Sequence, residues 1–330
     1  MLLNLLRSLF RRKPSHVAAP SMTNSGPVSP HEGSAAQKGL DVIGRRIDEI
    51  HERVAQLGRV EIWRYQAEAT SFVERILAQP RYDDPLRLER SGLKVYSQND
   101  EDGILAEIFR RIGTTNRRFL EFGVEKGLEN NTLCLLEQGW SGAWLEGSPD
   151  YVSAIETGFR RKINAGLLSI RQAIVDRDNI NELVGALALP HDLDLLSIDI
   201  DGNDYYVWEA ITAIEPRVVV IEYNAKFPPP MRWMMGYDAA HRWDGTDQSG
   251  ASLEVMADLG RRKGYRLVGC NITGVNAFFV KSGLAERRFA EPADAATLYQ
   301  PARYFLLPAF FSGHPPGYSR AQMPAPGSPE

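Results

Sequence analysis

The chain contains 330 residues, of which 43% are hydrophobic and 24% are charged, a composition typical of a folded globular protein with a sizeable core. Its formal net charge of −4 gives no overall indication of a nucleic-acid-binding protein. The two cysteines, Cys134 and Cys270, each lie in an apolar stretch. This predicts two buried thiols in a reducing, cytoplasmic compartment rather than a disulfide or a metal pair.

The first 35 residues are expected to lie outside the folded part of the chain. Residues 1–13 are apolar and then basic, an order that differs from a signal peptide, and the apolar run is too short to span a bilayer. Two interpretations stay open for them: a disordered tip, or a short interfacial helix on anionic headgroups at the inner face of a membrane. Residues 14–34 are rich in Pro, Ser, Gly and Ala without periodicity, which predicts a flexible linker.

Residues 36–80 are predicted to form a helical segment that ends near Ala78, before Pro80, with Gly58 as a weak point. Apolar residues recur in it at alternating steps of three and four positions, typical of a coiled-coil seam of nearly three heptads: Leu40, Ile43, Ile47, Ile50, Val54 and Leu57. Because so short a seam is marginal alone, we expect the helix either to form a two-stranded coiled coil in a homodimer or to pack on the main domain.

The main domain is expected to span residues 93–290, where strands and helices alternate. A first amphipathic helix ends near Ile112. The predicted strands after it are 119–122, 143–146, 169–175, 193–199, 218–222, 265–270 and 276–280, and the predicted helices are 131–138, 151–163, 180–187, 205–214 and 251–263. This alternation predicts a Rossmann-like α/β fold with a doubly wound, mostly parallel, seven-stranded sheet. The last two strands flank a short turn with Gly274 and are expected to pair antiparallel. The Pro- and Gly-rich residues 313–330 are expected to be disordered.

A glycine turn follows the first strand of this domain. The strand ends at Glu121-Phe-Gly123, Gly127 follows, and an acidic residue, Glu146, closes the next strand about twenty positions on. Small residues let a backbone approach a nucleotide, and a carboxylate accepts hydrogen bonds from ribose hydroxyls. A dinucleotide site needs three glycines as Gly-x-Gly-x-x-Gly, whereas this chain has Glu121-x-Gly123-x-x-x-Gly127. The pattern fits an S-adenosylmethionine site better than an NAD site.

Over roughly residues 96–280 the chain resembles the FkbM-like branch of the class I S-adenosylmethionine-dependent methyltransferases. The resemblance is carried by Tyr96-Ser-Gln-Asn-Asp-Glu-Asp-Gly103, Phe119-Leu-Glu-Phe-Gly-Val-Glu-Lys-Gly127, Gly142-Ala-Trp-Leu-Glu-Gly147, Leu196-Ser-Ile-Asp-Ile-Asp-Gly-Asn-Asp204 and Val219-Val-Ile-Glu-Tyr-Asn224. It implies methyl transfer to an oxygen nucleophile, often on a sugar or a secondary metabolite. One block departs from the pattern: the usual Asp-x-Glu-Gly is here Asp199-Ile-Asp201-Gly202, so an aspartate stands in place of the glutamate, and a further carboxylate, Asp204, follows.

Cofactor contacts are expected around the glycine turn. Glu121, Gly123 and Gly127 are predicted to form the floor under the methionine and ribose parts of the cofactor, and Glu146 is predicted to hold the ribose diol. The alternatives are a turn that uses glycine for geometry alone and an acid solvated at the end of a strand.

Three further residues are candidates for the two ends of the cofactor. Asp176, at the end of the third strand, is a candidate contact of the adenine amino group, and capping of the following helix is the equal alternative. Gln98 and Asn99 precede the first helix of the domain, where they either line the amino acid end of the cofactor or serve as caps.

Carboxylates also gather at the ends of the fourth and fifth strands. Asp199 and Asp201 follow one strand, and Glu222 and Asn224 end its neighbour. Oxygen ligands of this kind suit Mg²⁺, which would lower the pKa of a bound acceptor hydroxyl. In the alternative, Asp199 contacts the cofactor amine and the others cap the next helix and turn.

The segment 225–250 is longer than an ordinary connection, and such loops are commonly lids or binding loops. Trp233, Tyr237 and Trp243 are candidates to stack on a sugar or aromatic acceptor. His241, or a carboxylate such as Asp199, is the candidate catalytic base, with a hydrogen-bonded loop histidine as the alternative. The predicted function is S-adenosylmethionine-dependent O-methylation of a saccharide or related metabolite. Its rivals are an NAD-dependent oxidoreductase and a non-catalytic scaffold that dimerises through residues 40–57.

Overall fold

A computed structural model describes residues 30–306 of the chain, and their side-chain surroundings from residue 38 onward. The chain divides into two units, one ending at Trp63 and the other beginning at Arg64. The predicted amphipathic tip, most of the linker and the tail from residue 313 lie outside the described residues. Among the helices that are described, none has the length and apolar character needed to cross a membrane.

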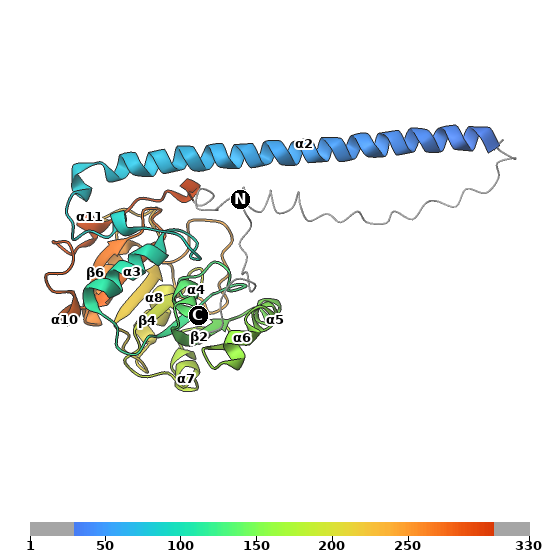
Figure 1. Ribbon diagram of the computed structural model, residues 1–330. Coiled ribbons are helices and arrows are strands. Elements are labelled where there is room, and N and C mark those ends of the chain that lie inside the picture. The colour runs from blue at the N-terminus through green and yellow to red at the C-terminus, as the bar shows by residue number, and fades with distance from the viewer. Residues whose placement is uncertain (1–29, 307–330) are drawn as a thin grey trace, which may run out of the picture. The chain divides into compact units, whose positions relative to one another are not determined.

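The predicted N-terminal helix is present as α2 (Pro30–Leu77), a continuous helix of 48 residues (Figure 1). It ends where the sequence predicts, one residue before Ala78, and Gly58 does not interrupt it, since a single helical glycine costs only about 1 kcal/mol. Its start at Pro30 lies within the stretch predicted as linker. In the second unit its last turns pack through Ala69 and Ile76 against a small core with Tyr82, Ile272 and Leu306.

The second unit is built on the predicted seven-stranded sheet. Its strands are β1 (Arg118–Phe122), β2 (Ser141–Glu146), β3 (Leu168–Gln172), β4 (Leu195–Ile198), β5 (Val218–Glu222), β6 (Tyr265–Cys270) and β7 (Asn276–Lys281), in the order 3-2-1-4-5-7-6. The pairs among β1 to β5 are parallel, whereas β7 is antiparallel to both β5 and β6. The predicted doubly wound sheet and its closing hairpin are therefore confirmed. The strand order reverses between β1 and β4, and ligands of such sheets bind at this point.

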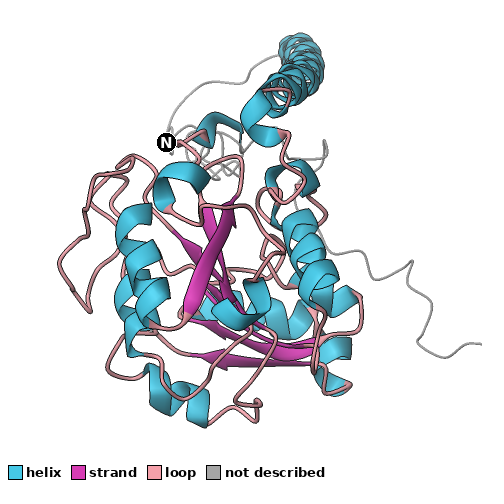
Figure 2. Cartoon of the chain, turned by 90° about the vertical axis from the view of Figure 1, so that its left-hand side faces the viewer, coloured by secondary structure: helices cyan, strands magenta, loops and turns pink. Residues whose placement is uncertain are grey.

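Helices cover both faces of the sheet (Figure 2). They are α3 (Glu101–Ile112), α4 (Leu133–Glu137), α5 (Pro149–Gly158), α6 (Arg160–Asn164), α7 (Ile180–Gly185), α8 (Asp204–Ala210), α9 (Leu253–Arg262), α10 (Ser282–Ala285) and α11 (Ala295–Leu298), with 3-10 turns η1 (Pro80–Tyr82) and η2 (Glu89–Ser91). The helix predicted over 151–163 is in fact two helices, separated at Phe159, whose backbone N–H still bonds Ile155. The ring of Phe159 is buried against Trp144, which fixes the break.

Side-chain alternation along the strands produces two cores. In β1, Leu120 and Phe122 belong to the core beneath α7, α8 and α9, whereas Phe119 belongs to the core beneath α3, α4 and α5. Successive side chains of a strand point to opposite faces, so the strands of a sheet covered on both sides are predominantly apolar. This explains why β4 and β5 are apolar at every position except Ser197 and Glu222.

A buried carboxylate organises the amino-terminal edge of the sheet. Asp194, fully buried, accepts hydrogen bonds from the backbone N–H groups of Thr115, Asn116 and Arg117 at 2.7 to 2.9 Å. Arg217 donates to the same carboxylate at 2.9 Å. The loop into β1, the start of β4 and the start of β5 are thereby tied to one side chain.

Replacing Asp194 with asparagine is expected to lower the free energy of unfolding by about 3 kcal/mol, because Arg217 loses its buried counter-charge and backbone donors lose an acceptor. Urea denaturation measures this loss. The matched control is Asp83→Asn: Asp83 pairs with Arg90 at 2.8 Å, but both side chains are more than half exposed. An exposed pair of this kind contributes less than about 1 kcal/mol. Equal losses in the two variants would contradict the structural role of Asp194.

Candidate functional site

The candidate site lies at the carboxyl ends of β1, β2, β4 and β5, around the point where the strand order reverses. Glu146 is the last residue of β2 and Glu222 the last residue of β5, and Asp199 directly follows β4. Because these strands are parallel, their carboxyl ends share one edge of the sheet. The structure therefore brings the predicted acids of different strands to one place.

The turn after β1 depends on glycine at both predicted positions. Gly123 and Gly127 have φ angles of 73° and 70°, and Glu125 between them also has a positive φ of 48°. A Cβ atom on Gly123 would lie 1.7 Å from the carbonyl oxygen of Asp199, and one on Gly127 would lie 2.6 Å from the ring of Trp144. Packing against neighbouring residues is therefore enough to require glycine at both positions. The sequence had suggested another reason, the close approach of the backbone to a ligand.

Glu121 lies inside the protein and supports the loop before α4. One carboxylate oxygen accepts from the backbone N–H of Asn131 and from Ser197 Oγ, and the other accepts from the N–H and the hydroxyl of Thr132. All four lone-pair positions of the carboxylate are used, so it has no acceptor left for a ligand. Burial raises the pKa of Glu121 to about 7, although these donors act in the opposite direction. Its expected direct cofactor contact is therefore replaced by a supporting role.

Glu146 keeps acceptor capacity at the end of β2. Each carboxylate oxygen accepts one backbone N–H at 2.8 Å, one from Glu125 in the glycine turn and one from Ser148. A carboxylate can accept four hydrogen bonds, so Glu146 retains acceptor capacity. The residue is 8% exposed, and burial raises its pKa. Glu146 is thus held in a fixed orientation beside the turn.

An apolar surface that the sequence analysis missed lies next to this acid. Ile174, which follows β3, is 54% exposed. Its Cγ1 lies 3.4 Å from the position of a Cβ atom on Gly147, the residue after Glu146. The absence of a side chain at Gly147 leaves this face of Ile174 open. The signal in the sequence was a glycine directly after the acid, paired with an isoleucine after the neighbouring strand.

Asp176 lies in the turn before α7, whose N-cap residue is Asn179. The Oδ1 atom of Asp176 accepts the backbone N–H groups of Asp178 and Asn179 at 2.8 Å, in the turn that leads into α7. This geometry is an Asx turn that leads into the helix, and it differs from the predicted helix cap because Asn179 occupies the N-cap position.

The two candidates before α3 differ from each other. Asn99 is fully buried; its amide nitrogen donates to Glu101 at 2.9 Å, and its Oδ1 has no hydrogen-bond partner among the described residues. Gln98 is exposed, and only its backbone carbonyl is engaged, by Lys94. Asn99 is therefore the candidate with an unmet acceptor inside the protein.

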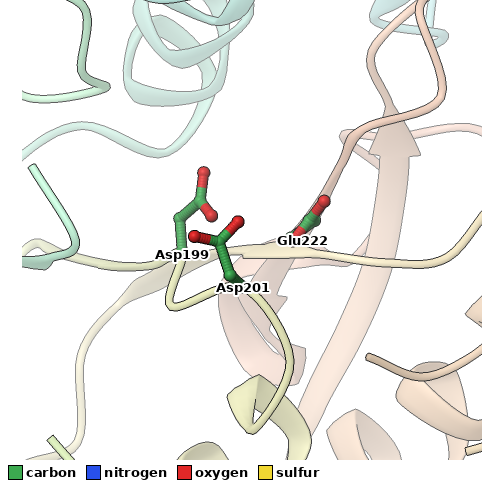
Figure 3. A group of neighbouring side chains, drawn as sticks. All are labelled: Asp199, Asp201 and Glu222. Carbon is green, nitrogen blue, oxygen red and sulfur yellow. The ribbon is translucent and has the colours of Figure 1, made fainter. Parts of the chain in front are cut away.

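Three of the four predicted metal ligands form a cluster. Carboxylate oxygens of Asp199, Asp201 and Glu222 all lie within 4.8 Å of one another (Figure 3). Asp199 and Glu222 are half-buried, and Asp201 is exposed, with a positive φ of 59°. Among the described residues, none donates a hydrogen bond to these three carboxylates. Burial first, and then repulsion between the acids, raises the pKa of both Asp199 and Glu222 well above their usual values.

Two neighbouring polar residues have other partners. Asp204 accepts the backbone N–H groups of Ile200 and Gly202 at 2.9 Å, so it shapes the loop that carries Asp199 and Asp201. The side-chain nitrogen of Asn224, the fourth predicted ligand, donates to the carbonyls of Asp247 and Ser249 at 2.9 Å. The side chain of Asn224 therefore anchors the end of the segment 225–250.

That segment, predicted to be a lid, is fastened to the loop after β4. Tyr206 donates to the carbonyl of Met235 and Asn203 to that of Asp238, both at 2.8 Å. The carbonyl of Asp201 accepts from Ser249 Oγ at 2.8 Å and lies 3.1 Å from Nε2 of His241. The segment therefore reaches the acid cluster through the backbone of Asp201.

The contact between Nε2 of His241 and the carbonyl of Asp201 indicates the tautomer of the neutral imidazole. A carbonyl oxygen only accepts hydrogen bonds, so Nε2 carries the proton and the lone pair of neutral His241 is on Nδ1. His241 is half-buried, and its ring lies 2.5 Å from where a Cβ atom of Gly202 would stand. The glycine thus makes room for the imidazole beside Asp201, and both predictions for His241, catalytic base and hydrogen-bonded histidine, remain compatible with the contact.

The three aromatic candidates in the segment are used differently. Trp233 stacks on Phe227 with ring centroids 4.3 Å apart, and Tyr237 lies under Arg177, 3.7 Å from the guanidinium carbon. Trp243 is 55% exposed and donates its ring N–H to the carbonyl of Thr246. Of the three, Trp243 offers the largest free surface.

The order 3-2-1-4-5-7-6 with an antiparallel β7 defines the α/β methyltransferase fold. No protein-family model and no curated protein sequence matches the chain, so the resemblance to the FkbM-like branch has no family-level support. Several solved structures do match at low identity. An S-adenosylmethionine-dependent methyltransferase from Clostridium acetobutylicum ATCC 824 is 11% identical with a TM-score of 0.36, over 64% of this chain and 98% of that one.

Two O-methyltransferases match over about half of this chain. The enzyme from Bacillus cereus, solved in complex with SAH, is 17% identical with a TM-score of 0.30, over 49% of this chain and 67% of that one. The StiE O-methyltransferase is 15% identical with a TM-score of 0.31, and this chain covers 50% of it. At these identities and TM-scores the matches do not indicate an activity. The fold assignment rests on the order and direction of the strands.

Proposed function

We propose that the chain is an S-adenosylmethionine-dependent O-methyltransferase that acts on a hydroxyl group of a saccharide or related metabolite, assisted by a divalent cation. The observation that carries the proposal is Glu146. It closes β2 with acceptor capacity left on its carboxylate, and the glycine turn after β1 holds it in place. A carboxylate at this point of a doubly wound sheet is suited to bind the two hydroxyls of a ribose.

Two further features suit the rest of the cofactor: an apolar surface beside Glu146, and an unpartnered acceptor in the segment before α3. The exposed face of Ile174 supplies apolar surface for a nucleobase next to the ribose acid. The unpartnered Oδ1 of buried Asn99 supplies an acceptor for an ammonium group. When bound, S-adenosylmethionine supplies a methyl group on a sulfonium centre. The protein contributes by binding and orienting, and alignment of a nucleophile with the methyl group accounts for much of such a rate enhancement.

The acid cluster supports the cation. Three carboxylates that receive no hydrogen bond from the described residues repel one another, and a hard divalent cation such as Mg²⁺ satisfies all three with the oxygen ligands that it prefers. Asp199, Asp201 and Glu222 would hold it. Bound there, it would supply Lewis acidity that lowers the pKa of an acceptor hydroxyl. His241 lies beside Asp201, and the lone pair on its Nδ1 atom would accept the proton of the acceptor hydroxyl.

The acceptor class is supported by the segment 225–250. Trp243 presents an exposed indole in the same segment as His241. The apolar face of an indole packs on the C–H surface of a sugar ring, while its N–H is already satisfied by Thr246. A methylation assay with labelled cofactor and extracted glycans tests this class directly.

Titration calorimetry with S-adenosylhomocysteine tests the cofactor assignment. Glu146→Gln is expected to weaken binding about 10- to 100-fold, since hydrogen bonds to a charged group contribute about 1.5 to 3 kcal/mol. Glu156→Gln, at an exposed position on α5, is the matched control and is expected to bind like the wild type. Thermal unfolding of both variants checks that the fold is intact.

Two outcomes would overturn the proposal. Tight binding of NADH without binding of S-adenosylhomocysteine would favour an oxidoreductase. Binding of neither nucleotide, with a cellular role that survives Glu146→Ala, would favour a scaffold.

A further inference from the structure

An apolar seam that has no partner among the described residues lies along the first unit of the chain. Six apolar side chains of α2 follow the heptad spacing, and each is 47 to 66% exposed: Leu40, Ile43, Ile47, Ile50, Val54 and Leu57. They occupy positions a and d of the heptad, the positions that form the core of a coiled coil. A continuous exposed stripe of this kind marks an interaction surface.

The length of the seam identifies the kind of partner. From Leu40 to Leu57 the helix rises about 26 Å at about 1.5 Å per residue. Apart from α2, no helix in the described part of the chain exceeds the 12 residues of α3. A partner helix must match the seam in length and in the spacing of its apolar residues. A second copy of α2 meets both requirements.

We propose that α2 associates with α2 of a second copy of the chain as a parallel, in-register coiled coil centred on residues 40–57. Charge selects the orientation. Position g, which flanks the seam, holds Arg46 and Arg53. In a parallel pair these face position e of the partner, occupied by the partner's His51 and the partner's Gly58. In an antiparallel pair each arginine faces the other arginine of the partner, which creates two like-charge contacts.

The seam combines layers that favour different numbers of strands. Val54 at position a with Leu57 at position d favours two strands, whereas Ile47 and Ile50 at these positions favour three. Either number retains the parallel contact between copies. A core of fewer than three full heptads is short, so we expect association to depend on protein concentration.

Sedimentation of the full-length protein over a range of concentrations tests self-association. Val54→Asp places a charge inside the proposed seam and is expected to move the midpoint of association at least tenfold higher in concentration. Val42→Asp is the matched control, because Val42 is also exposed, at 46%, but lies at position c, outside the seam. It is expected to behave like the wild type within twofold. A wild type that stays monomeric, or equal effects of the two variants, would overturn the proposal.

Oxidative cross-linking tests the orientation. In a Cys134→Ser background, which leaves only buried Cys270, Leu40→Cys places one thiol at the end of the seam. In a parallel pair the two thiols share a layer and form a disulfide readily. In an antiparallel pair they lie about 26 Å apart and cannot react. Cross-linking that Val54→Asp suppresses supports the proposal, and its absence in an associating protein would overturn the parallel arrangement.

Discussion

Replacing Gly123 with alanine is expected to destabilise the protein by about 2 to 5 kcal/mol. Two costs combine. The φ of 73° is a left-handed conformation, which costs an alanine about 1 to 2 kcal/mol. The new Cβ would also lie 1.7 Å from the carbonyl oxygen of Asp199, so the backbone of one loop must move, a cost of about 1 to 3 kcal/mol or more.

A second glycine separates these two costs. Gly139 has a φ of 83°, yet a Cβ there would meet nothing within 4 Å. Gly139→Ala therefore measures the conformational cost alone, about 1 to 2 kcal/mol. Urea unfolding of the two variants should differ by at least about 1 kcal/mol. Equal losses would show that the turn after β1 is free to move away from the loop after β4.

Because Gly123 contacts the backbone of Asp199, the same substitution is expected to affect binding at the site. Displacement of the loop after β4 would move Asp199 relative to Glu222 and weaken divalent-cation affinity. Cation titration at a temperature where the variant remains folded measures this. Unchanged affinity would indicate that the loop after β1, and not the loop after β4, gives way.

Replacing Asp199 with asparagine is expected to have opposite effects on stability with and without a divalent cation. In EDTA at neutral pH the variant should be more stable than the wild type, because it removes one of three mutually repelling carboxylates. With saturating Mn²⁺ or Mg²⁺ the wild type should gain stability and the variant should not. A cation at about 100 times its dissociation constant stabilises by about 2.7 kcal/mol.

The pH dependence has a defined sign. Burial and repulsion raise the pKa of Asp199 and Glu222 in the folded protein above the unfolded carboxyl value of about 4. Above pH 4, and up to the raised values, the folded state holds more protons than the unfolded state. Stability of the cation-free wild type therefore falls as pH rises through this window. Asp199→Asn should flatten the slope, and cation affinity should increase with pH as protons stop competing.

Thermal unfolding between pH 5 and 8, with EDTA or with Mn²⁺, measures both effects. Asp192→Asn, at an exposed position before β4, is the control and should follow the wild type in every condition. If Mn²⁺ stabilises the wild type and Asp199→Asn equally, the cluster does not hold the cation. If EDTA also leaves methyl transfer intact, the metal has no part in the reaction.

Local patterns of the sequence determined the architecture of the second unit. Apolar runs bounded by turn residues located most strands, because a parallel sheet covered on both faces is predominantly apolar. The strand β3 is the exception, since it reads Leu-Ser-Ile-Arg-Gln and is largely exposed or half-buried. The alternation with helices then fixed the parallel direction of β1 to β5, and parallel strands bring their carboxyl ends to one edge. For this reason the meeting of Asp199 with Glu222 could be predicted from positions alone.

The partners of individual side chains were decided by the tertiary structure. Glu121 looked like a cofactor ligand, but its four donors come from residues 131, 132 and 197, which only the packing of the loop before α4 against β4 brings together. The contact between His241 and the carbonyl of Asp201 spans 40 positions and depends on the path of a loop without periodicity. Hydrogen bonds of this kind are set by the register and course of segments far apart in the chain, which a local pattern of apolar and polar residues does not encode.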